Sequence, residues 1–236
     1  RTDYIFIPFD FYFIWSKAHY KHVSDGQHIK SNCKFYVTGC PFYNNVNFRE
    51  LKKKNLEQIY DILVIGEYYL HDYSAQPFNT SATLKLAEVL KKYQEKIKIC
   101  VRPRLHDEYY HDMFSVLKDN VIYSFPENET TASTSIIKDI KRSKVVISML
   151  SGGMHDALII DKPIIQANFL GIVEPKGLDS HNAVYYSDSV TSLINLIDDF
   201  FKGKLEKIDN KYNKKYFLNN GQFNLERVKE VIHQYL

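Results

Sequence analysis

The segment from Ser148 to Asp156 carries the residue types and spacing that best suit a phosphate-binding turn. Gly152 and Gly153 follow an expected buried strand and open an expected helix. The first N–H groups of a helix have no partner within the helix and lie at the positive end of its dipole, so they bind anions readily. Glycines let a pyrophosphate approach the backbone, and the hydroxyls of Ser148 and Ser151 can add hydrogen bonds.

Two further candidate donor-binding residues lie one turn into this expected helix. The spacing allows the Asp156 carboxylate to accept hydrogen bonds from ribose hydroxyls, and His155 lies beside it. A purely structural interpretation stays open, in which Ser151 only caps the helix and Asp156 only complements its dipole.

A second polar cluster follows the next expected strands. Pro103 ends a strand, so we expect Arg102 and Arg104 to point into the ligand crevice, where guanidinium groups can bind phosphate through two parallel hydrogen bonds. Glu127, after a third strand, could contact a base from the same edge of the sheet. The alternative is a solvated loop of cationic side chains.

Other catalytic signatures are missing from the sequence. No histidine pair has the spacing of an HExxH zinc site, and no Walker loop, GxGxxG or GxSxG motif is present. The three cysteines form no CxxC motif, which favours a reducing compartment and disfavours a disulfide framework. We therefore expect neither a metal nor a cofactor.

The composition is that of an ordinary globular protein, with 44% hydrophobic and 25% charged residues. The 31 basic and 28 acidic residues give a net charge of +3, which does not indicate a nucleic-acid partner. A weakly basic surface suits local phosphate recognition or loose contact with an acidic bilayer. No apolar stretch approaches the length that crosses a membrane.

Short β-branched runs alternate with amphipathic segments from residue 61 onward. The expected strands cover 61–65, 97–101, 121–123, 145–147, 163–167 and 183–186. The expected helices cover 81–93, 109–117, 131–142, 153–160, 189–201 and 223–236. This alternation predicts an α/β fold, a Rossmann-like doubly wound parallel sheet whose carboxyl edge holds the ligand.

These motifs together resemble the C-terminal domain of GT-B-fold transferases of bacterial surface polysaccharides. The nearest groups are the capsule-polysaccharide glycosyltransferases and the CDP-glycerol glycerophosphotransferases. Asp156-Ala-Leu and Lys162-Pro-Ile-Ile match the family's Glu-Ala-Leu and Lys-Pro-Ile-Ile segment, so Asp156 stands where the family has its ribose-binding Glu. Arg102-Pro103 stands where the family usually has His-Pro, and an arginine cannot replace that histidine as an acid or base at neutral pH.

The resemblance also implies a domain organisation. Residues 15–44, which include Gly39-Cys-Pro41, resemble the passage that closes the family's N-terminal domain. We therefore expect the end of an acceptor-side domain over 1–46, a linker over 47–60, the nucleotide-donor-binding domain over 61–205, and a tail with a crossing helix over 206–236. Because the chain opens on Arg1 and continues directly into a strand, we expect it to be a part of a longer protein.

The function implied by the resemblance is a metal-independent glycosyltransferase. It would move a sugar or polyol phosphate from a nucleotide-activated donor to a growing surface polysaccharide such as a capsule. The acceptor would be a glycan or a lipid-linked glycan, reached in the cytoplasm or at the inner face of the bacterial membrane. Candidates in this chain for the general base are Glu67, His71 and Asp72, after the first expected strand of the sheet.

Two alternatives stay open. UDP-sugar 2-epimerases share the Ser-Gly-Gly helix start but continue with a Gln-Glu-Glu run, whereas this chain continues His155-Asp156-Ala157. The chain could also be a non-catalytic nucleotide- or glycan-binding module.

Overall fold

The computed structural model describes residues 6–7, 9–26, 28–29, 32–41, 56–66, 76–103, 112–125, 129–149, 151–169, 178 and 181–236. The chain forms two compact units. The larger unit comprises Lys52–Ile208, and the smaller unit comprises Arg1–Leu51 together with Asp209–Leu236.

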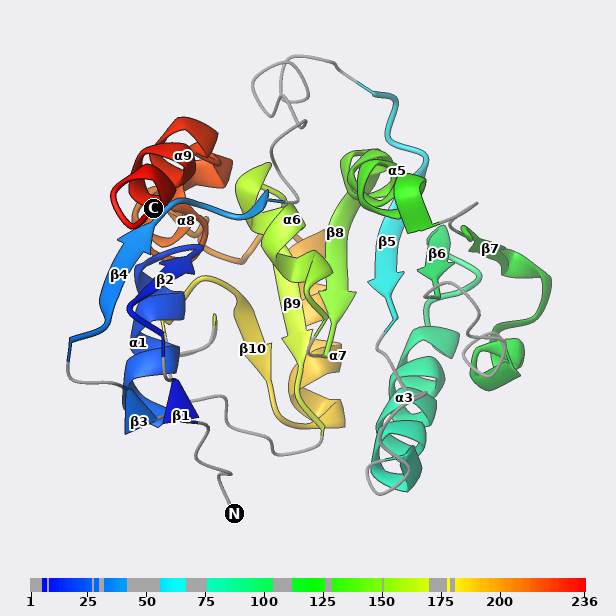
Figure 1. Ribbon diagram of the computed structural model, residues 1–236. Helices are drawn as coiled ribbons and strands as arrows, with labels where there is room; N and C mark the ends of the chain where they lie inside the picture. The colour runs from blue at the N-terminus through cyan, green and yellow to red at the C-terminus, as the bar shows by residue number, and fades with distance from the viewer. Residues whose placement is uncertain are drawn as a thin grey trace. The chain divides into compact units, whose positions relative to one another are not determined.

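Six parallel strands form the sheet of the larger unit (Figure 1). They are β5 (Tyr60–Ile65), β6 (Ile99–Arg102), β7 (Val121–Tyr123), β8 (Ser143–Ser148), β9 (Ile164–Ala167) and β10 (Tyr185–Ser187). Their spatial order is β10-β9-β8-β5-β6-β7. Numbered along this unit alone, that is 6-5-4-1-2-3, the order of dinucleotide-binding doubly wound sheets. The predicted Rossmann-like fold is thus confirmed.

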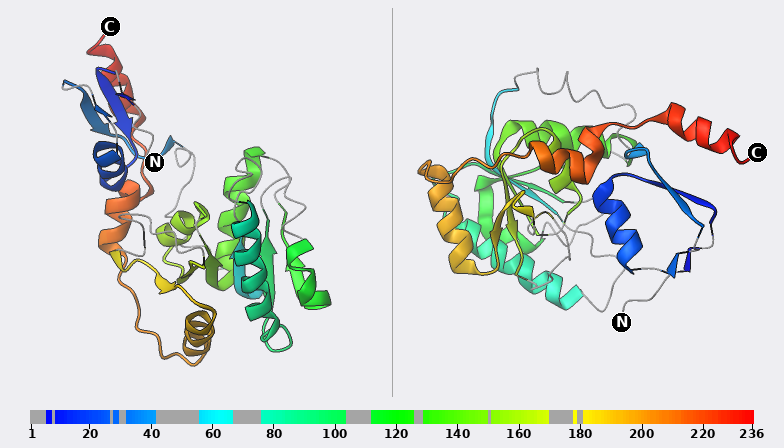
Figure 2. Two further views of the ribbon diagram at one scale, coloured as in Figure 1. Left: turned by 90° about the horizontal axis from the view of Figure 1, so that it is seen from below. Right: turned by 90° about the vertical axis from the view of Figure 1, so that its left-hand side faces the viewer.

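Helices cover both faces of this sheet. They are α3 (Gln76–Lys91), α5 (Glu129–Arg142), α6 (Gly153–Ile159) and α7 (Val190–Phe201), with a short 3₁₀ helix, η2 (Ser115–Asn120). One apolar cluster joins α3 and α7 to the strand residues that face them, including Ile165 and Ala167. Helices α5 and α6 contact β8 from the other side (Figure 2, right).

Polar contacts fix the layer formed by α3 and α7. The Tyr93 hydroxyl, after the end of α3, donates to Asp198 Oδ1 at 2.8 Å and lies 3.2 Å from the Ile194 carbonyl oxygen. Ser189 caps α7, where its side chain accepts a hydrogen bond from the Ser192 N–H. The predicted start of that helix at residue 189 is therefore confirmed as a cap.

The smaller unit contains two pairs of short parallel strands. Strand β1 (Phe6–Ile7) pairs with β3 (His28–Ile29), and β2 (Phe11–Ile14) pairs with β4 (Lys34–Val37). Its helices are α1 (Lys17–Gly26), α8 (Lys211–Leu218), η4 (Asn219–Gly221) and α9 (Leu225–His233).

Gly39 lies where the C-terminal segment of the chain passes the early segment of the smaller unit. Its φ is +84°, and a Cβ added to it would overlap the Gln222 carbonyl oxygen. The Asn224 N–H donates to the Thr38 carbonyl at 2.7 Å in the same region. A side chain at position 39 is therefore excluded both by the backbone conformation and by this close approach.

Two local predictions differ from the structure. In the described part of 109–117, residues 112–113 are α-helical as expected, but η2 replaces the α-helix from Ser115 onward; Phe114, just before η2, and Leu117 are both fully buried. A 3₁₀ helix aligns side chains three residues apart, so it buries this pair on one side. Helix α8 was not expected, because its sequence is dominated by lysine and tyrosine and has a weak apolar stripe.

Candidate functional site

The centre of the sheet contains the topological switch point, between β5 and β8. The chain crosses from β5 towards β6 in one direction and from β8 towards β9 in the other. Ligands of open α/β sheets bind outside the carboxyl ends of the strands at such a point. Here the two strands end at Ile65 and Ser148. The buried Ser148 hydroxyl donates to the Ile65 carbonyl at 3.2 Å, which ties the two strand ends together.

Ser148 and Ser151 also shape the turn that leads into α6. The Ser151 N–H donates to Ser148 Oγ at 3.4 Å, and the Gly153 N–H donates to Ser151 Oγ at 3.4 Å. The Met154 N–H donates to the Ser151 carbonyl at 3.0 Å. The N-cap of α6 is Gly152, so Ser151 lies one residue before the cap and contacts the first amide of the helix from there.

The two glycines of the turn have different environments. A Cβ at Gly153 would lie 2.8 Å from Ile136 Cδ1 and 3.0 Å from Ile65 Cδ1. Gly153 therefore allows α6 to pack closely against β5 and α5. A Cβ at Gly152 would meet no described residue within 4 Å, and Gly152 is exposed. Open space in front of the Gly152 backbone is what an approaching ligand phosphate needs.

His155 and Asp156 both lie in the first turn of α6 and are partly buried. Burial lowers the pKa of His155, and a hydrogen bond with the backbone of Gly152 opposes this change only in part. The imidazole is therefore neutral at pH 7 and can serve as a hydrogen-bonding group beside the turn. Asp156 adds negative charge near the helix start, where the dipole favours it.

Arg102 lies at the carboxyl end of its strand, as expected, but its side chain contacts a residue that the sequence did not indicate. It is the last residue of β6, it is 4% exposed, and its guanidinium forms an ion pair with Asp139 of α5. Its Nη2 donates to Ser135 Oγ at 2.6 Å, and Ser124 Oγ donates to Asp139 at 2.6 Å. The guanidinium is thus held inside the protein by an anion of the chain itself.

Lys162, in the Lys-Pro segment of the resemblance, is similarly engaged. Its Nζ donates to the Lys141 carbonyl at 3.3 Å and to the Ser143 carbonyl, so it caps the end of α5. Burial, and then the nearby Lys141 charge, lower the pKa of Lys162 to about 8.

Sequence reasoning missed Gln166. It lies in β9, paired in register with Ser148 and with Tyr186 of β10, and its side chain is 4% exposed. A glutamine within the otherwise apolar run Ile164-Ile165-Gln166-Ala167 is the signal that could have revealed it.

Five other predicted site residues fall outside the described residues: Glu67, His71, Asp72, Arg104 and Glu127. Among the residues that are described, no cluster of three potential metal ligands occurs. The same part of the chain has no helix that is both long and apolar enough to cross a membrane.

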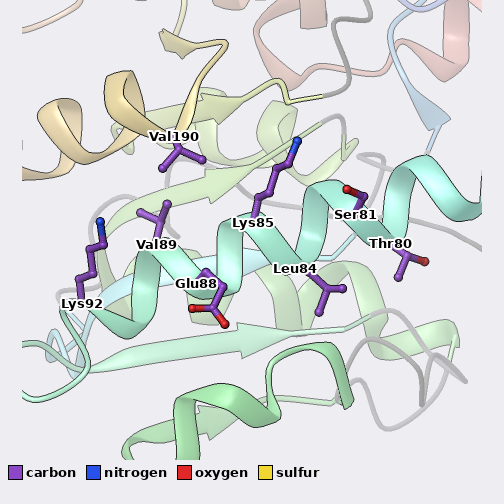
Figure 3. Close-up of a pocket in the computed structure, with 8 residues that line it drawn as sticks. All are labelled: Thr80, Ser81, Leu84, Lys85, Glu88, Val89, Lys92 and Val190. Atoms are coloured by element: carbon purple, nitrogen blue, oxygen red, sulfur yellow. The ribbon is translucent and has the colours of Figure 1, made fainter.

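A shallow pocket of about 530 Å³ lies on the outer side of α3 (Figure 3). Residues of α3 and the segment after it line the pocket, together with Val190 at the start of α7. Because α3 and α7 cover the face of the sheet opposite to α6, this pocket is separate from the turn at Gly152.

Comparison with known proteins agrees with this architecture. No protein-family model and no curated protein matches the sequence. Among solved structures, UDP-GlcNAc 2-epimerase of Methanocaldococcus jannaschii, in complex with UDP-GlcNAc and UDP, gives a TM-score of 0.57 at 13% identity. The similarity covers 95% of this chain and 61% of that one.

Two further structures are similar in the same way. MnaA of S. aureus, in a structure with UDP, gives a TM-score of 0.54 at 13% identity over 96% of this chain and 59% of that one. The wall teichoic acid polymerase TagF, in a structure with CDP-glycerol, gives a TM-score of 0.53 at 15% identity. This similarity covers 96% of this chain and 56% of that one. At these identities the similarities show the fold alone. The chain has the Rossmann-like α/β fold of GT-B-type proteins and spans less than two thirds of these structures.

Proposed function

We propose that this chain is the donor-binding part of a transferase that moves a sugar or polyol phosphate from a nucleotide-activated donor to a bacterial surface polysaccharide. One observation carries the proposal. At the switch point of a Rossmann-like sheet, the Ser148 hydroxyl links the ends of β5 and β8, and the following turn presents the exposed Gly152 backbone to open space.

The turn would contribute to catalysis by holding the departing nucleotide. The backbone amides at the start of α6 and the Ser151 hydroxyl would bind the diphosphate, and Asp156 would accept hydrogen bonds from ribose hydroxyls. The neutral His155 imidazole would add one hydrogen bond beside them. Donors fixed in place before the reaction stabilise the charge that develops on a leaving phosphate as its bond to the sugar breaks.

The acceptor, the general base and the remaining donor contacts are proposed from the sequence. The acceptor would be a glycan or lipid-linked glycan at the cytoplasmic side of the membrane, and no metal would be needed. Glu67, His71 and Asp72 stay predictions for the general base, and Arg104 and Glu127 stay predictions for donor contacts. We leave Arg102 out of the phosphate-binding set, because Asp139 already neutralises its charge in a buried pair.

A thermal-shift screen with CMP, CDP, UDP and GDP tests the proposal. At least one nucleotide should raise the melting temperature of the wild-type chain, because ligand binding to the folded state stabilises it. Gly152→Asp places a carboxylate where the diphosphate should bind, whereas Gly152→Asn adds a side chain of the same size without charge. Both side chains have room, so both variants should fold.

We expect Gly152→Asp to abolish the nucleotide-induced shift and Gly152→Asn to reduce it less. Failure of every nucleotide to stabilise the wild type would contradict the proposed function. An unchanged shift in Gly152→Asp would remove the diphosphate from this turn.

A UDP-sugar 2-epimerase is the second candidate. The Ser151-Gly152-Gly153 helix start favours it, since those enzymes begin the corresponding helix in the same way. Incubation with UDP-GlcNAc and no acceptor, followed by proton NMR, separates the two: accumulation of the 2-epimer supports the epimerase and contradicts the transferase. Nucleotide binding without either reaction would instead support a non-catalytic binding module.

A further inference from the structure

Gln166 has a buried side-chain oxygen that receives no hydrogen bond from the described residues. The side chain is 4% exposed, and no described residue donates to Oε1. Proteins rarely leave such an atom unpaired, because a buried amide oxygen loses its hydration without compensation. Such an oxygen indicates a ligand partner only where it lies beside a candidate ligand-binding turn, and the strand register places Gln166 there.

The position of Gln166 relates this oxygen to the turn before α6. Gln166 is the register partner of Ser148, on the neighbouring strand. Adjacent strands lie about 4.8 Å apart, so Gln166 is one strand away from the residue that shapes the turn. Ile165 and Ala167 face the α3 and α7 cluster, so Gln166, between them, faces the side where α6 contacts β9.

Ser148, Gln166 and Tyr186 are register partners on three neighbouring strands, and the last of them reaches solvent. Tyr186 is the register partner of Gln166 on β10 and is 38% exposed. The Tyr186 hydroxyl accepts a hydrogen bond from Asn168 Nδ2 at 3.0 Å. These three register partners thus run from the fully buried Ser148, through Gln166, to a partly exposed tyrosine on the edge strand.

We propose that Gln166 is a specificity-determining residue whose amide oxygen accepts a hydrogen bond from a hydroxyl of the bound nucleotide-linked donor. An amide oxygen only accepts hydrogen bonds, so the ligand must donate one. A diphosphate at the turn carries no proton to donate at neutral pH. The groups directly attached to it, the ribose and the transferred sugar or polyol, both carry hydroxyls. This inference rests on the proposed nucleotide-binding function.

The test uses Gln166→Leu, which removes the amide at similar volume. Gln94→Leu is the matched control: Gln94 Oε1 is likewise buried without a donor in the described part of the chain, but it lies just after α3, on the other face of the sheet. Affinities for UDP, CDP, UDP-GlcNAc and CDP-glycerol are measured by calorimetry, and the melting temperature is measured without ligand.

Gln166→Leu should lower the affinity for the compound that the wild type binds about 3- to 10-fold, because one neutral hydrogen bond is lost. Gln94→Leu should leave affinity unchanged, and neither variant should lower the melting temperature of the free protein. An equal loss for the nucleotide and its sugar or polyol derivative assigns the ribose hydroxyl. A loss confined to the derivative assigns the transferred group.

Two outcomes overturn the role of Gln166 and leave the proposed function standing. One is unchanged affinity in Gln166→Leu. The other is a marked loss of stability or a failure to fold, which would show that the oxygen has a partner within the protein. If the wild type binds none of the four compounds, the proposed function fails and this inference fails with it.

Discussion

The Ser148 hydroxyl donates a hydrogen bond to the Ile65 carbonyl oxygen at 3.2 Å, across the carboxyl ends of the two central strands. Sequence separates the two residues by 83 positions, yet the sheet makes them neighbours at the switch point. The same hydroxyl accepts from the Ser151 N–H, so one buried side chain links both strand ends to the start of α6. Nucleotide binding and local stability are therefore expected to change together when it is removed.

Ser148→Ala should lower the free energy of unfolding by about 1 to 3 kcal/mol, because it removes a buried hydrogen-bonding hydroxyl. It should also weaken the nucleotide-induced thermal shift. The control is Ser143→Ala, at the other end of β8, whose buried hydroxyl donates to the Ile140 carbonyl at 2.8 Å. Urea denaturation should show similar losses for both variants, with nucleotide binding affected only in Ser148→Ala. Equal binding by the two variants would contradict a role of the Ser148 turn in ligand contact.

Replacing each of the adjacent glycines by alanine should have opposite effects on stability. Gly153→Ala forces a methyl group against Ile136 and Ile65 and should lower the free energy of unfolding by about 1 to 3 kcal/mol. Gly152→Ala has space and a helical φ of −54°, so it should be neutral or stabilise by up to about 1 kcal/mol. Urea denaturation of the two variants provides the comparison, and equal costs would show that α6 does not pack as described.

The buried Arg102–Asp139 pair should matter for stability and not for nucleotide binding. Asp139→Asn leaves the Arg102 guanidinium without its anion and should lower the free energy of unfolding by about 3 to 5 kcal/mol. The double variant Arg102→Met with Asp139→Leu removes both charges and should recover much of this loss. It should keep the wild-type thermal shift with nucleotide. A double variant that folds but no longer binds nucleotide would show that Arg102 does contribute to phosphate binding.

Lys162 should make stability rise with pH in alkaline solution. Burial lowers the pKa of Lys162 to about 8 in the folded chain, against 10.5 for an unperturbed lysine. Between these values the unfolded state binds more protons than the folded state, so the free energy of unfolding contributed by this group increases with pH. The cost of the buried charge is fully present below pH 8.

Comparison of the wild type with Lys162→Met isolates this contribution from that of Tyr60, Tyr123 and Tyr185, whose raised pKa values act in the opposite direction in both proteins. The wild type should gain stability relative to the variant between pH 8 and about 10.5. Denaturation curves at several pH values give the difference, and a difference independent of pH would mean that Lys162 keeps an ordinary pKa.

Local patterns were sufficient to predict most of the sheet. The β-branched runs gave each strand of the larger unit to within a few residues, because a strand buried on both faces must be apolar throughout. Patterns failed where packing competes with propensity. Helix α8 has little apolar periodicity, and the segment around Phe114 forms a 3₁₀ helix that buries Phe114 together with Leu117.

The sequence by itself determined the fold class and the turn from Ser148 to Gly153, because these depend on short-range order: alternating strands and helices, and two glycines after a buried strand. Only the tertiary structure decided how individual side chains are used. It paired Arg102 with Asp139, 37 residues away, and it placed Gln166 beside Ser148. Both outcomes depend on strand order and register, which bring together residues that no local pattern connects.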